Sequence, residues 1–129
     1  MSDKQDRAVE LKQRTGDAHY NCCQAVVMAL IEETGLTEEQ AKAAASGFCV
    51  GMGTMENTCG ALIGAGMAAG LKVGGQGTVR YTRALTESFR ARCGALLCRE
   101  LKGAGSGKII CPCDECARNA VLAYGEVMK

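Results

Sequence analysis

The chain lacks most of what nucleic-acid binding and membrane insertion require. Its 129 residues include no tryptophan, two phenylalanines and three tyrosines, and 15 basic residues nearly balance 14 acidic ones. Without a basic run or stacking aromatic side chains, we expect no nucleic-acid partner. The uncharged stretch at residues 59–71, CGALIGAGMAAGL, falls short of the roughly 20 residues that cross a bilayer. We therefore expect no membrane span and interpret this stretch as a buried helix.

Export signals and histidine-based motifs are also scarce. The first residues, MSDKQDRAVELKQR, alternate charged and polar side chains without an apolar segment, which predicts a cytoplasmic protein. The single histidine, His19, follows no CxxC pair, so covalent haem attachment is excluded. We expect His19 at the surface or in a capping role. Few aromatic residues and abundant alanine argue against β-strands.

Cysteine, in contrast, is abundant. Disulfides are rare in a reducing cytoplasm, and an odd number of cysteines leaves one thiol unpaired. A chain of this length can also bury a core without covalent crosslinks. Because thiols are soft metal ligands, nucleophiles and redox groups, we expect metal binding or redox chemistry. The nine cysteines are Cys22, Cys23, Cys49, Cys59, Cys93, Cys98, Cys111, Cys113 and Cys116.

Apolar spacing predicts a single all-α domain over residues 1–129. The architecture is a compact bundle of about five to six helices with glycine-rich loops. The predicted helical segments, two of them short, are residues 4–14, 18–34, 37–46, 58–71, 78–93, 95–101 and 113–128. The predicted glycine-rich loops are residues 47–53, 70–77 and 103–107.

Helix caps and core positions follow from the same pattern. Asp17 is expected to cap the second helix. Thr37, with Gln40 three residues later, predicts a capping box at the start of the third. The candidate core residues of the first and fifth helices are Ala8, Val9, Leu11, Val79, Leu85 and Phe89.

Glycine is concentrated inside the fourth predicted helix, where each interior glycine costs roughly 1 kcal/mol relative to alanine. Gly60, Gly64 and Ala68 lie on one face at intervals of four, and Gly66 and Gly70 form a second pair. Both faces predict a close neighbour, either another helix backbone or a bulky inorganic group. A homodimer would explain them as well as an internal interface does.

Cys59 is the leading candidate for a reactive or metal-ligating thiol. It is expected in the first turn of that helix, just after Thr58, where free N–H groups and the helix dipole lower a thiol pKa. Upstream, Gly47, Gly51 and Gly53 are expected to turn backbone N–H groups toward a bound anion or cluster sulfur.

The densest group of thiols is the C-terminal Cys111-Pro-Cys113-Asp-Glu-Cys116. This CxCxxC spacing suits one metal ion or one corner of an iron–sulfur cluster. Cys113 and Cys116 would also suit a dithiol switch, but Asp114 and Glu115 between them disfavour thiolates.

Charged neighbours distinguish two other cysteines. Arg90 and Arg92 precede and flank Cys93, and Arg99 follows Cys98. Their positive charges would favour thiolates if the fold aims them inward, and would otherwise be solvated.

Cys22 and Cys23 diverge by about 100° around their helix. Cys22 shares an apolar stripe with Val26 and Ala29, so a buried core cysteine is one interpretation and a site residue the other. Cys23 is expected to be a satellite of the site.

Several short segments of the chain form one ordered pattern. They are Tyr20-Asn21-Cys22, Ser46-Gly47-Phe48, Gly51-Met52-Gly53, Thr58-Cys59-Gly60-Ala61-Leu62-Ile63-Gly64 and Cys98-Arg99-Glu100-Leu101, followed by a cysteine before the last helix. With these segments the chain resembles the C_GCAxxG_C_C family of redox-active proteins over about residues 18–128. The core reads Cys-Gly-Ala here, where the family label has Gly-Cys-Ala.

The resemblance implies a small helical protein and a shared set of cysteines. These are Cys22, Cys59, Cys98 and Cys116, with Cys113 the alternative to Cys116. The remaining cysteines, Cys23, Cys49, Cys93, Cys111 and Cys113, look additional to that set. Related domains in larger electron-transfer proteins that carry iron–sulfur clusters point in the same direction.

The leading functional prediction is a cytoplasmic redox protein that transfers electrons through an iron–sulfur cluster held by thiolates. The predicted cofactor ligands are Cys22, Cys59, Cys98, Cys113 and Cys116; the predicted metal ligands are Cys59, Cys98, Cys111, Cys113 and Cys116. The first alternative is a metal-free thiol-disulfide oxidoreductase with Cys59 as nucleophile and Cys22 or Cys98 as resolving thiol. The second is a structural zinc or interaction module, which only Cys113-x-x-Cys116 fits cleanly. The redox partner protein is left open.

Overall fold

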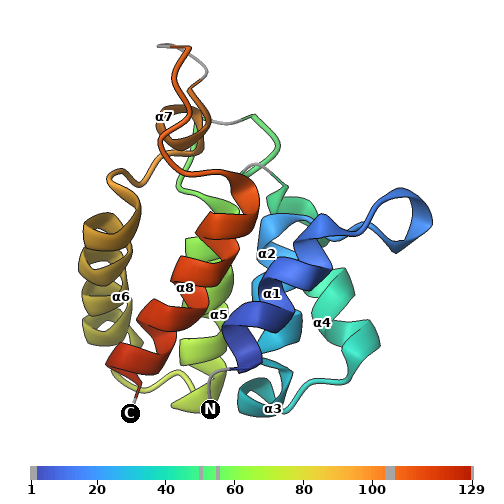
Figure 1. The fold of residues 1–129 in the computed structure, drawn as a ribbon. Coiled ribbons are helices and arrows are strands. Elements are labelled where there is room, and N and C mark those ends of the chain that lie inside the picture. The colour runs from blue at the N-terminus through green and yellow to red at the C-terminus, as the bar shows by residue number, and fades with distance from the viewer. Residues whose placement is uncertain (1–2, 50, 55, 104–106, 129) are drawn as a thin grey trace.

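The computed structural model of the chain describes residues 3–49, 51–54, 56–103 and 107–128. Within these ranges the protein folds into eight α-helices and two 3-10 helices, which confirms the all-α prediction (Figure 1). Val50 and residues 104–106, which belong to two of the predicted loops, lie outside the described residues. The helices are α1 (Asp3–Gln13), η1 (Gly16–Ala18), α2 (Cys22–Ala29), α3 (Ile31–Thr34), α4 (Glu38–Ala45), η2 (Ser46–Phe48), α5 (Gly60–Lys72), α6 (Thr78–Cys93), α7 (Cys98–Lys102) and α8 (Cys113–Val127).

Eight α-helices exceed the predicted five to six, partly because the segment predicted over residues 18–34 breaks. Leu30 leaves the helical conformation (φ −99°, ψ 20°) and separates α2 from α3. The predicted cap at Asp17 is also wrong. Asn21 caps α2 instead, because its side chain accepts the Gln24 N–H at 2.8 Å while the Gln24 side chain accepts the Asn21 N–H at 2.9 Å.

The predicted capping box at the start of α4 is confirmed. The Thr37 hydroxyl accepts the Gln40 N–H at 3.1 Å, and the Gln40 side chain accepts the Thr37 N–H at 3.0 Å. Gly35 ends α3 and Gly94 ends α6, both in the left-handed conformation that glycine adopts without steric cost.

α5 lies inside the bundle because its surface is almost entirely glycine, alanine and aliphatic side chains. It packs against α2, α6 and α8, while α1 covers α2 and α8 (Figure 1). α2 is buried on two sides: Cys22 and Val26 belong to one hydrophobic core, Cys23 and Val27 to a second. No helix in the described part of the chain is long and apolar enough to cross a membrane.

Of the six candidate core residues, Val9 is half-buried, and Ala8, Leu11, Leu85 and Phe89 are fully buried as predicted. Val79 is not, because 68% of it is exposed. Leu85, Phe89 and Cys93 follow one another at intervals of four along α6, whereas Val79 lies six residues before Leu85. Six residues turn an α-helix by about 240°, which takes Val79 off the buried face.

The two glycine faces of α5 meet different neighbours. A methyl group at Gly60 would lie 2.5 Å from the carbonyl oxygen of Phe48, and one at Gly64 would lie 3.0 Å from that of Cys23. Gly66 and Gly70 face threonine methyl groups of α6 at 3.5 and 3.6 Å, which is ordinary contact. The close neighbour of the face that carries Gly60 and Gly64 is therefore the backbone of η2 and α2. A close backbone contact was one of the two explanations predicted for the glycines.

Candidate functional site: a cluster of buried thiols

Seven of the nine cysteines gather at the end of the bundle that carries α7 and the start of α8 (Figure 1). Six of the seven are buried, and Cys113 is half-buried. All nine cysteines are free thiols. The thiol cluster, as we call it, consists of Cys22, Cys59, Cys93, Cys98, Cys111, Cys113 and Cys116.

Two cysteines lie outside the thiol cluster. Cys23 points into the second core, where its Sγ lies 3.7 Å from the Sδ of Met67 and where burial raises its pKa to about 12. Cys49 is exposed just after η2. The predicted divergence of Cys22 and Cys23 is thereby confirmed, since the two thiols enter separate cores.

Four members of the thiol cluster stand at the starts of four helices. Cys22, Cys98 and Cys113 are the first residues of α2, α7 and α8, and Cys59 is the N-cap of α5. We call them the helix-start cysteines. Free backbone N–H groups and the positive end of the helix dipole favour an anion at such positions. The first turns of α2 and α8 are in direct contact, because the Cys22 thiol lies 3.7 Å from the carbonyl oxygen of Cys113.

A short β-bridge aligns two of these positions. Thr58 pairs with Leu97 in antiparallel fashion. On either side of the pair, the Cys59 N–H donates across the bridge at 2.9 Å and the Cys98 N–H donates back at 3.1 Å. This clamp fixes the start of α5 beside the start of α7, and so places two cysteines 39 positions apart in the sequence next to each other.

The loop after α7 is folded tightly against that helix. The carbonyl oxygen of Leu101 accepts the N–H groups of both Ile110 and Cys111, at 3.0 and 3.1 Å. Gly103 turns the chain with a φ of 75°, and a methyl group there would lie 2.5 Å from the carbonyl group of Lys108. These contacts bring Cys111 back against α7 and α8.

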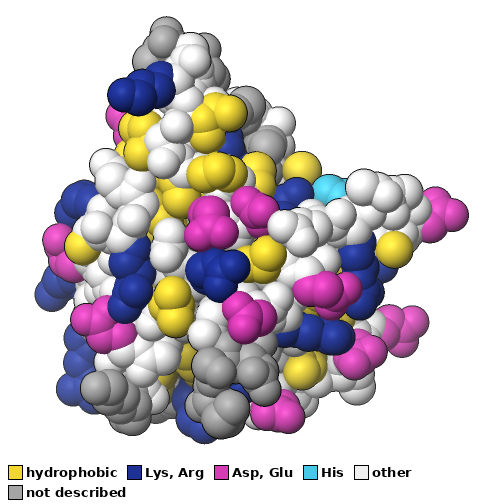
Figure 2. All heavy atoms as spheres, in the orientation of Figure 1, with side chains coloured by type: hydrophobic (Ala, Val, Ile, Leu, Met, Phe, Trp, Pro, Cys, Tyr) yellow, Lys and Arg dark blue, Asp and Glu magenta, His cyan; other side chains and the backbone are white. Residues whose placement is uncertain are grey.

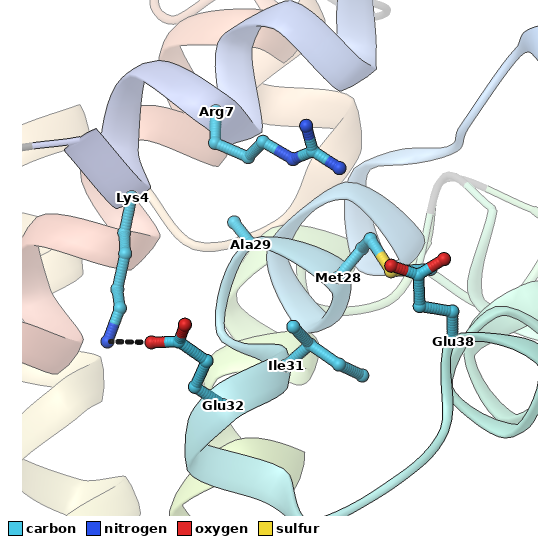
Figure 3. Close-up of a pocket in the computed structure, with 7 residues that line it drawn as sticks. All are labelled: Lys4, Arg7, Met28, Ala29, Ile31, Glu32 and Glu38. Carbon is cyan, nitrogen blue, oxygen red and sulfur yellow. Dashed lines mark ion pairs between the residues drawn. The ribbon is translucent and has the colours of Figure 1, made fainter.

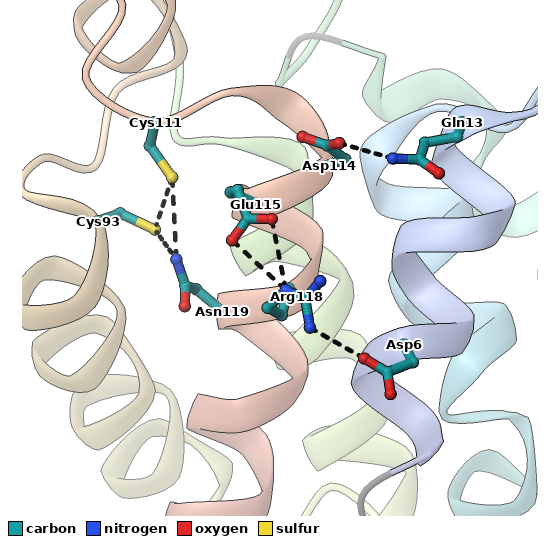
Figure 4. Close-up of polar contacts among 8 residues, drawn as sticks. All are labelled: Asp6, Gln13, Cys93, Cys111, Asp114, Glu115, Arg118 and Asn119. Carbon is teal, nitrogen blue, oxygen red and sulfur yellow. Dashed lines mark hydrogen bonds and ion pairs between the residues drawn. The ribbon is translucent and has the colours of Figure 1, made fainter.

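Three thiols form a compact triad on the α6 side of the cluster. The Sγ atoms of Cys93, Cys111 and Cys116 all lie within 4.8 Å of one another, and those of Cys93 and Cys111 are 3.3 Å apart (Figure 4). The side-chain amide of Asn119 points at this pair, with its Nδ2 3.4 Å from the sulfur of Cys93 and 3.9 Å from that of Cys111. Within the described part of the chain, no other three candidate ligand atoms close up as tightly.

Thiol contacts link the triad to the helix-start cysteines in one continuous series. Cys22 interacts with Cys113 and with Cys59, and Cys59 interacts in turn with Cys116 of the triad. Cys98 lies beside the series, where burial raises its pKa and the neighbouring charge of Cys59 adds to the rise. In order along the series the thiols are Cys113, Cys22, Cys59, Cys116, Cys111 and Cys93.

Raised and lowered pKa values alternate along this series because each thiolate accepts hydrogen bonds from its neighbours. The neighbouring Cys116 and Cys22 thiols, with Lys102 and the Ala61 N–H, lower the pKa of Cys59 to about 3 despite its burial. The pKa values of Cys22 and Cys116 are raised in turn, because both thiols lie beside cysteines that are stabilised as thiolates. At neutral pH the arrangement favours a thiolate at Cys59.

The two ends of the series follow the same rule. The neighbouring Cys116 and Cys93 thiols, with Lys102 and Asn119, lower the pKa of Cys111 to about 3, while the neighbouring Cys111 raises that of Cys93 to about 12. At the other end the Cys22 thiol, helped by Lys102, lowers the pKa of Cys113 to about 6.

Lys102 is the cation of the site. Its Nζ lies 3.2 Å from the Sγ of Cys116 and 3.5 Å from the carbonyl oxygen of Cys111. Burial acts to lower the pKa of Lys102, but the surrounding thiolates outweigh burial and raise it. The half-buried ammonium therefore stays charged and offsets negative charge in the cluster.

The arginines that the sequence places near Cys93 and Cys98 do not face the thiols. Arg90 is exposed beside Glu87, 3.1 Å away, and Arg92 pairs with Glu126 at 3.1 Å. Arg99 is exposed as well. The arginines point outward, and the cation that faces the thiols comes from the end of α7.

The carboxylates inside the CxCxxC segment also point away from the sulfurs (Figure 4). Asp114 accepts a hydrogen bond from Gln13 of α1 at 3.0 Å, and Glu115 pairs with Arg118 at 3.4 Å. The expectation that they disfavour a thiolate is therefore wrong for Cys113, whose pKa is lowered.

The structure also tests the expectations for the glycine-rich loop before α5 and for His19. Gly51 and Gly53 do not offer their N–H groups to an anion, because these donate to the carbonyl oxygens of Phe48 and Cys49 at 3.2 and 2.7 Å. His19 is exposed, as predicted, with its Nδ1 3.3 Å from the carbonyl oxygen of Arg14.

Comparison with known protein families gives a match over most of the chain. Residues 20–127 match the family model described as "Putative redox-active protein (C_GCAxxG_C_C)". The chain belongs to the C_GCAxxG_C_C family. Among curated proteins and among solved structures, the comparisons give no match.

Sequence reasoning on this member of the C_GCAxxG_C_C family missed Cys93. Cys93 was not among the predicted ligands, yet it belongs to the triad with Cys111 and Cys116. The signal was its spacing: Leu85, Phe89 and Cys93 recur every four residues, so Cys93 had to face the core of the bundle.

A cavity of about 410 Å³ lies away from the thiols, between α1, α2, α3 and α4. Lys4 and Glu32 pair across it at 4.0 Å (Figure 3). No cysteine lines it. The full lining is Lys4, Arg7, Met28, Ala29, Ile31, Glu32 and Glu38.

The pKa of Cys113 gives a first testable prediction. In reduced, metal-free protein we expect alkylation of Cys113 to be half-maximal near pH 6, because its thiolate persists above its lowered pKa and is lost as pH falls below it. Lys102→Met removes a facing positive charge and should move this midpoint upward. Arg99→Met, which removes an exposed charge from the same helix, should leave it in place. Mass spectrometry of the labelled peptide measures the midpoint, and equal midpoints in all three proteins would contradict the role given to Lys102.

Proposed function

We propose that this protein is a cytoplasmic redox carrier in which the four helix-start cysteines, Cys22, Cys59, Cys98 and Cys113, ligate an iron–sulfur cluster. One observation carries the proposal: thiols from four separate helix starts converge on one largely buried site. Iron–sulfur clusters take four cysteine thiolates, and this set supplies that number from thiols alone.

The spacing of the helix-start cysteines supports a polynuclear centre. Around a single ion, metal–sulfur bonds of about 2.3 Å hold ligand sulfurs roughly 3.8 Å apart. In a polynuclear cluster each thiolate can bind a different iron atom, so the sulfurs lie farther apart. No three of the four helix-start sulfurs come within 4.8 Å of one another, although Cys22 contacts both Cys59 and Cys113.

The surrounding charges suit an anionic centre. α2, α5 and α8 begin at this site, where the positive ends of helix dipoles favour an anion, and the Ala61 N–H already donates to the Cys59 sulfur. The ammonium of Lys102 offsets further negative charge. An iron–sulfur cluster, when bound, supplies reversible one-electron transfer. The protein's part is to hold its sulfurs in place, exclude water, and set the potential through N–H donors and Lys102.

Electron exchange with a partner protein would take place at the end of the bundle that carries α7. Cys113 is the one half-buried member of the thiol cluster. Ile109 and Ile110 are 62% and 52% exposed just before Cys111. Figure 2 shows hydrophobic side chains gathered over this same end of the molecule. A partner that docks here approaches the thiols through the least protein.

Thiol-disulfide exchange is the second candidate, because Cys113 is both half-buried and in contact with Cys22. The Cys113 thiolate would attack an external disulfide and release one thiolate. The Cys22 thiol, after losing its proton, would attack the mixed disulfide and release the second. The products are a Cys22–Cys113 disulfide and two reduced substrate thiols. Cys59, the nucleophile predicted from the sequence, is only 1% exposed, so Cys113 is the better placed of the two to meet a substrate.

Metal and sulfide analysis of protein purified without air tests the proposal. We expect a brown protein with iron and acid-labile sulfide in equal amounts and a visible band that bleaches on reduction. Colourless, iron-free protein would reject the iron–sulfur cluster. In that case, mapping of a Cys22–Cys113 disulfide after oxidation would favour the second candidate.

A further inference from the structure

The thiol cluster contains more sulfur than one four-thiolate centre uses. The three thiols outside the helix-start set are those of the triad, Cys93, Cys111 and Cys116. They come from different local structures: Cys93 is the last residue of α6, Cys111 lies in the loop before α8, and Cys116 lies within α8. The convergence of helix starts therefore does not explain why these three thiols lie together.

From this triad we infer a second metal site, which binds one divalent thiophilic ion of the zinc class through Cys93, Cys111 and Cys116. Mutual sulfur distances within 4.8 Å match thiolates that share one ion, because zinc–sulfur bonds of about 2.3 Å place ligand sulfurs roughly 3.8 Å apart. The 3.3 Å between the sulfurs of Cys93 and Cys111 widens to that separation by a small rotation of either side chain.

The charges around the triad select a divalent ion. Lys102 lies 3.2 Å from the sulfur of Cys116, and its positive charge also lowers the pKa of Cys111. Three thiolates, one divalent ion and one ammonium group are together neutral. A monovalent ion would leave one negative charge in a buried site, where an uncompensated charge is costly.

Asn119 supplies the hydrogen bonding that metal-bound thiolates require. Its amide reaches both Cys93 and Cys111 from one turn beyond Cys116 (Figure 4). An N–H group aimed at two sulfurs orients them as acceptors and stabilises their negative charge. Soft thiolates select zinc over magnesium, calcium and manganese, whose preferred ligands are oxygens.

The triad adjoins the helix-start cysteines, because Cys116 contacts Cys59, but the two proposed sites share no ligand and can be tested separately. Reduced protein, purified without air, is titrated with Zn²⁺ against a chromophoric chelator, and iron and sulfide are measured on the same sample. We expect one tightly held zinc per chain. In Cys93→Ser the zinc affinity should fall at least 100-fold while iron and sulfide stay unchanged, because Cys93 is not a helix-start cysteine.

Two further variants keep the test decisive. Asn119→Ala retains all three thiols and should weaken zinc binding roughly 10- to 100-fold, as loss of a hydrogen bond to a ligand does. Cys49→Ser removes an exposed thiol outside the cluster and should change nothing. If Cys93→Ser does not fold, a drop of zinc affinity in Asn119→Ala still supports the site, and an unchanged affinity overturns it.

The remaining outcomes also decide between the sites. Zinc retained in Cys59→Ala but lost in Cys93→Ser supports the triad whether or not iron is present. Absence of tight zinc binding, or equal zinc affinity in Cys93→Ser and Cys49→Ser, overturns the inference. Loss of iron together with zinc in Cys93→Ser would mean that one centre uses all seven thiols, and would overturn the separation of the two sites.

Discussion

Cys59→Ala is expected to lower the iron and sulfide content of anaerobically purified protein by roughly tenfold or more, because it removes a ligand of the centre. Cys59 occupies the centre of the thiol series, where it contacts both Cys22 and Cys116. It is also the N-cap of α5, where the helix dipole favours a thiolate. Elemental analysis and the visible spectrum measure the loss.

Cys23→Ala is the matched control for this variant. Cys23 and Cys59 are equally inaccessible, at 0% and 1% exposure, so the same substitution removes one buried sulfur from each. Both variants should lose a similar amount of packing energy. Only Cys59→Ala should lose the centre, because Cys23 faces Met67 in the other core. Equal iron content in the two variants would contradict the ligand role of Cys59.

Gly60→Ala should produce the largest loss of stability among single methyl additions to α5. The new methyl group would lie 2.5 Å from the carbonyl oxygen of Phe48, so η2 or α5 has to move. Overpacking of this kind costs roughly 1–3 kcal/mol, which exceeds the gain of up to about 1 kcal/mol from replacing a helical glycine by alanine. Denaturant unfolding of the metal-free, reduced protein measures the change. Since Gly60 follows Cys59 directly, we also expect less complete incorporation of iron.

Gly66→Ala gives the opposite sign on the same helix. Its methyl group would meet the Thr82 methyl at 3.5 Å, an ordinary contact, so the helix propensity of alanine should raise stability by up to about 1 kcal/mol. Gly70→Ala, at 3.6 Å from the Thr78 methyl, should behave likewise. Destabilisation by Gly66→Ala as large as that by Gly60→Ala would show that the close approach to Phe48 does not decide the outcome.

Local signals in the sequence predict the helices well where one residue decides a boundary. The capping box of Thr37 and Gln40 fixes the start of α4, and Gly94 fixes the end of α6. Where two residues compete, local rules choose wrongly: Asp17 and Asn21 are both acceptable N-caps, and only Asn21 is followed by Gln24 to complete a capping box. Val79 failed as a core residue because the helix period, rather than hydrophobicity alone, decides which side faces inward.

The charges around the thiols could not be predicted from distance along the chain. Arg92 is next to Cys93 in the sequence but pairs with Glu126, whereas Lys102 reaches Cys116 from 14 positions away. Side chains adjacent on a helix point about 100° apart, so sequence neighbours seldom face the same partner. Asp114 and Glu115 likewise pair with Gln13 and Arg118 rather than with the thiols.

The sequence alone determined that this chain is an all-α member of a cysteine-rich redox family, because helix periodicity, caps and the Cys-Gly-Ala-x-x-Gly segment are local properties. The tertiary structure alone decided which thiols meet. The β-bridge between Thr58 and Leu97, and the tight contact of Gly60 with Phe48, join segments distant in the chain. Such contacts depend on how whole helices pack, and no pattern within one helix encodes which neighbour it will find.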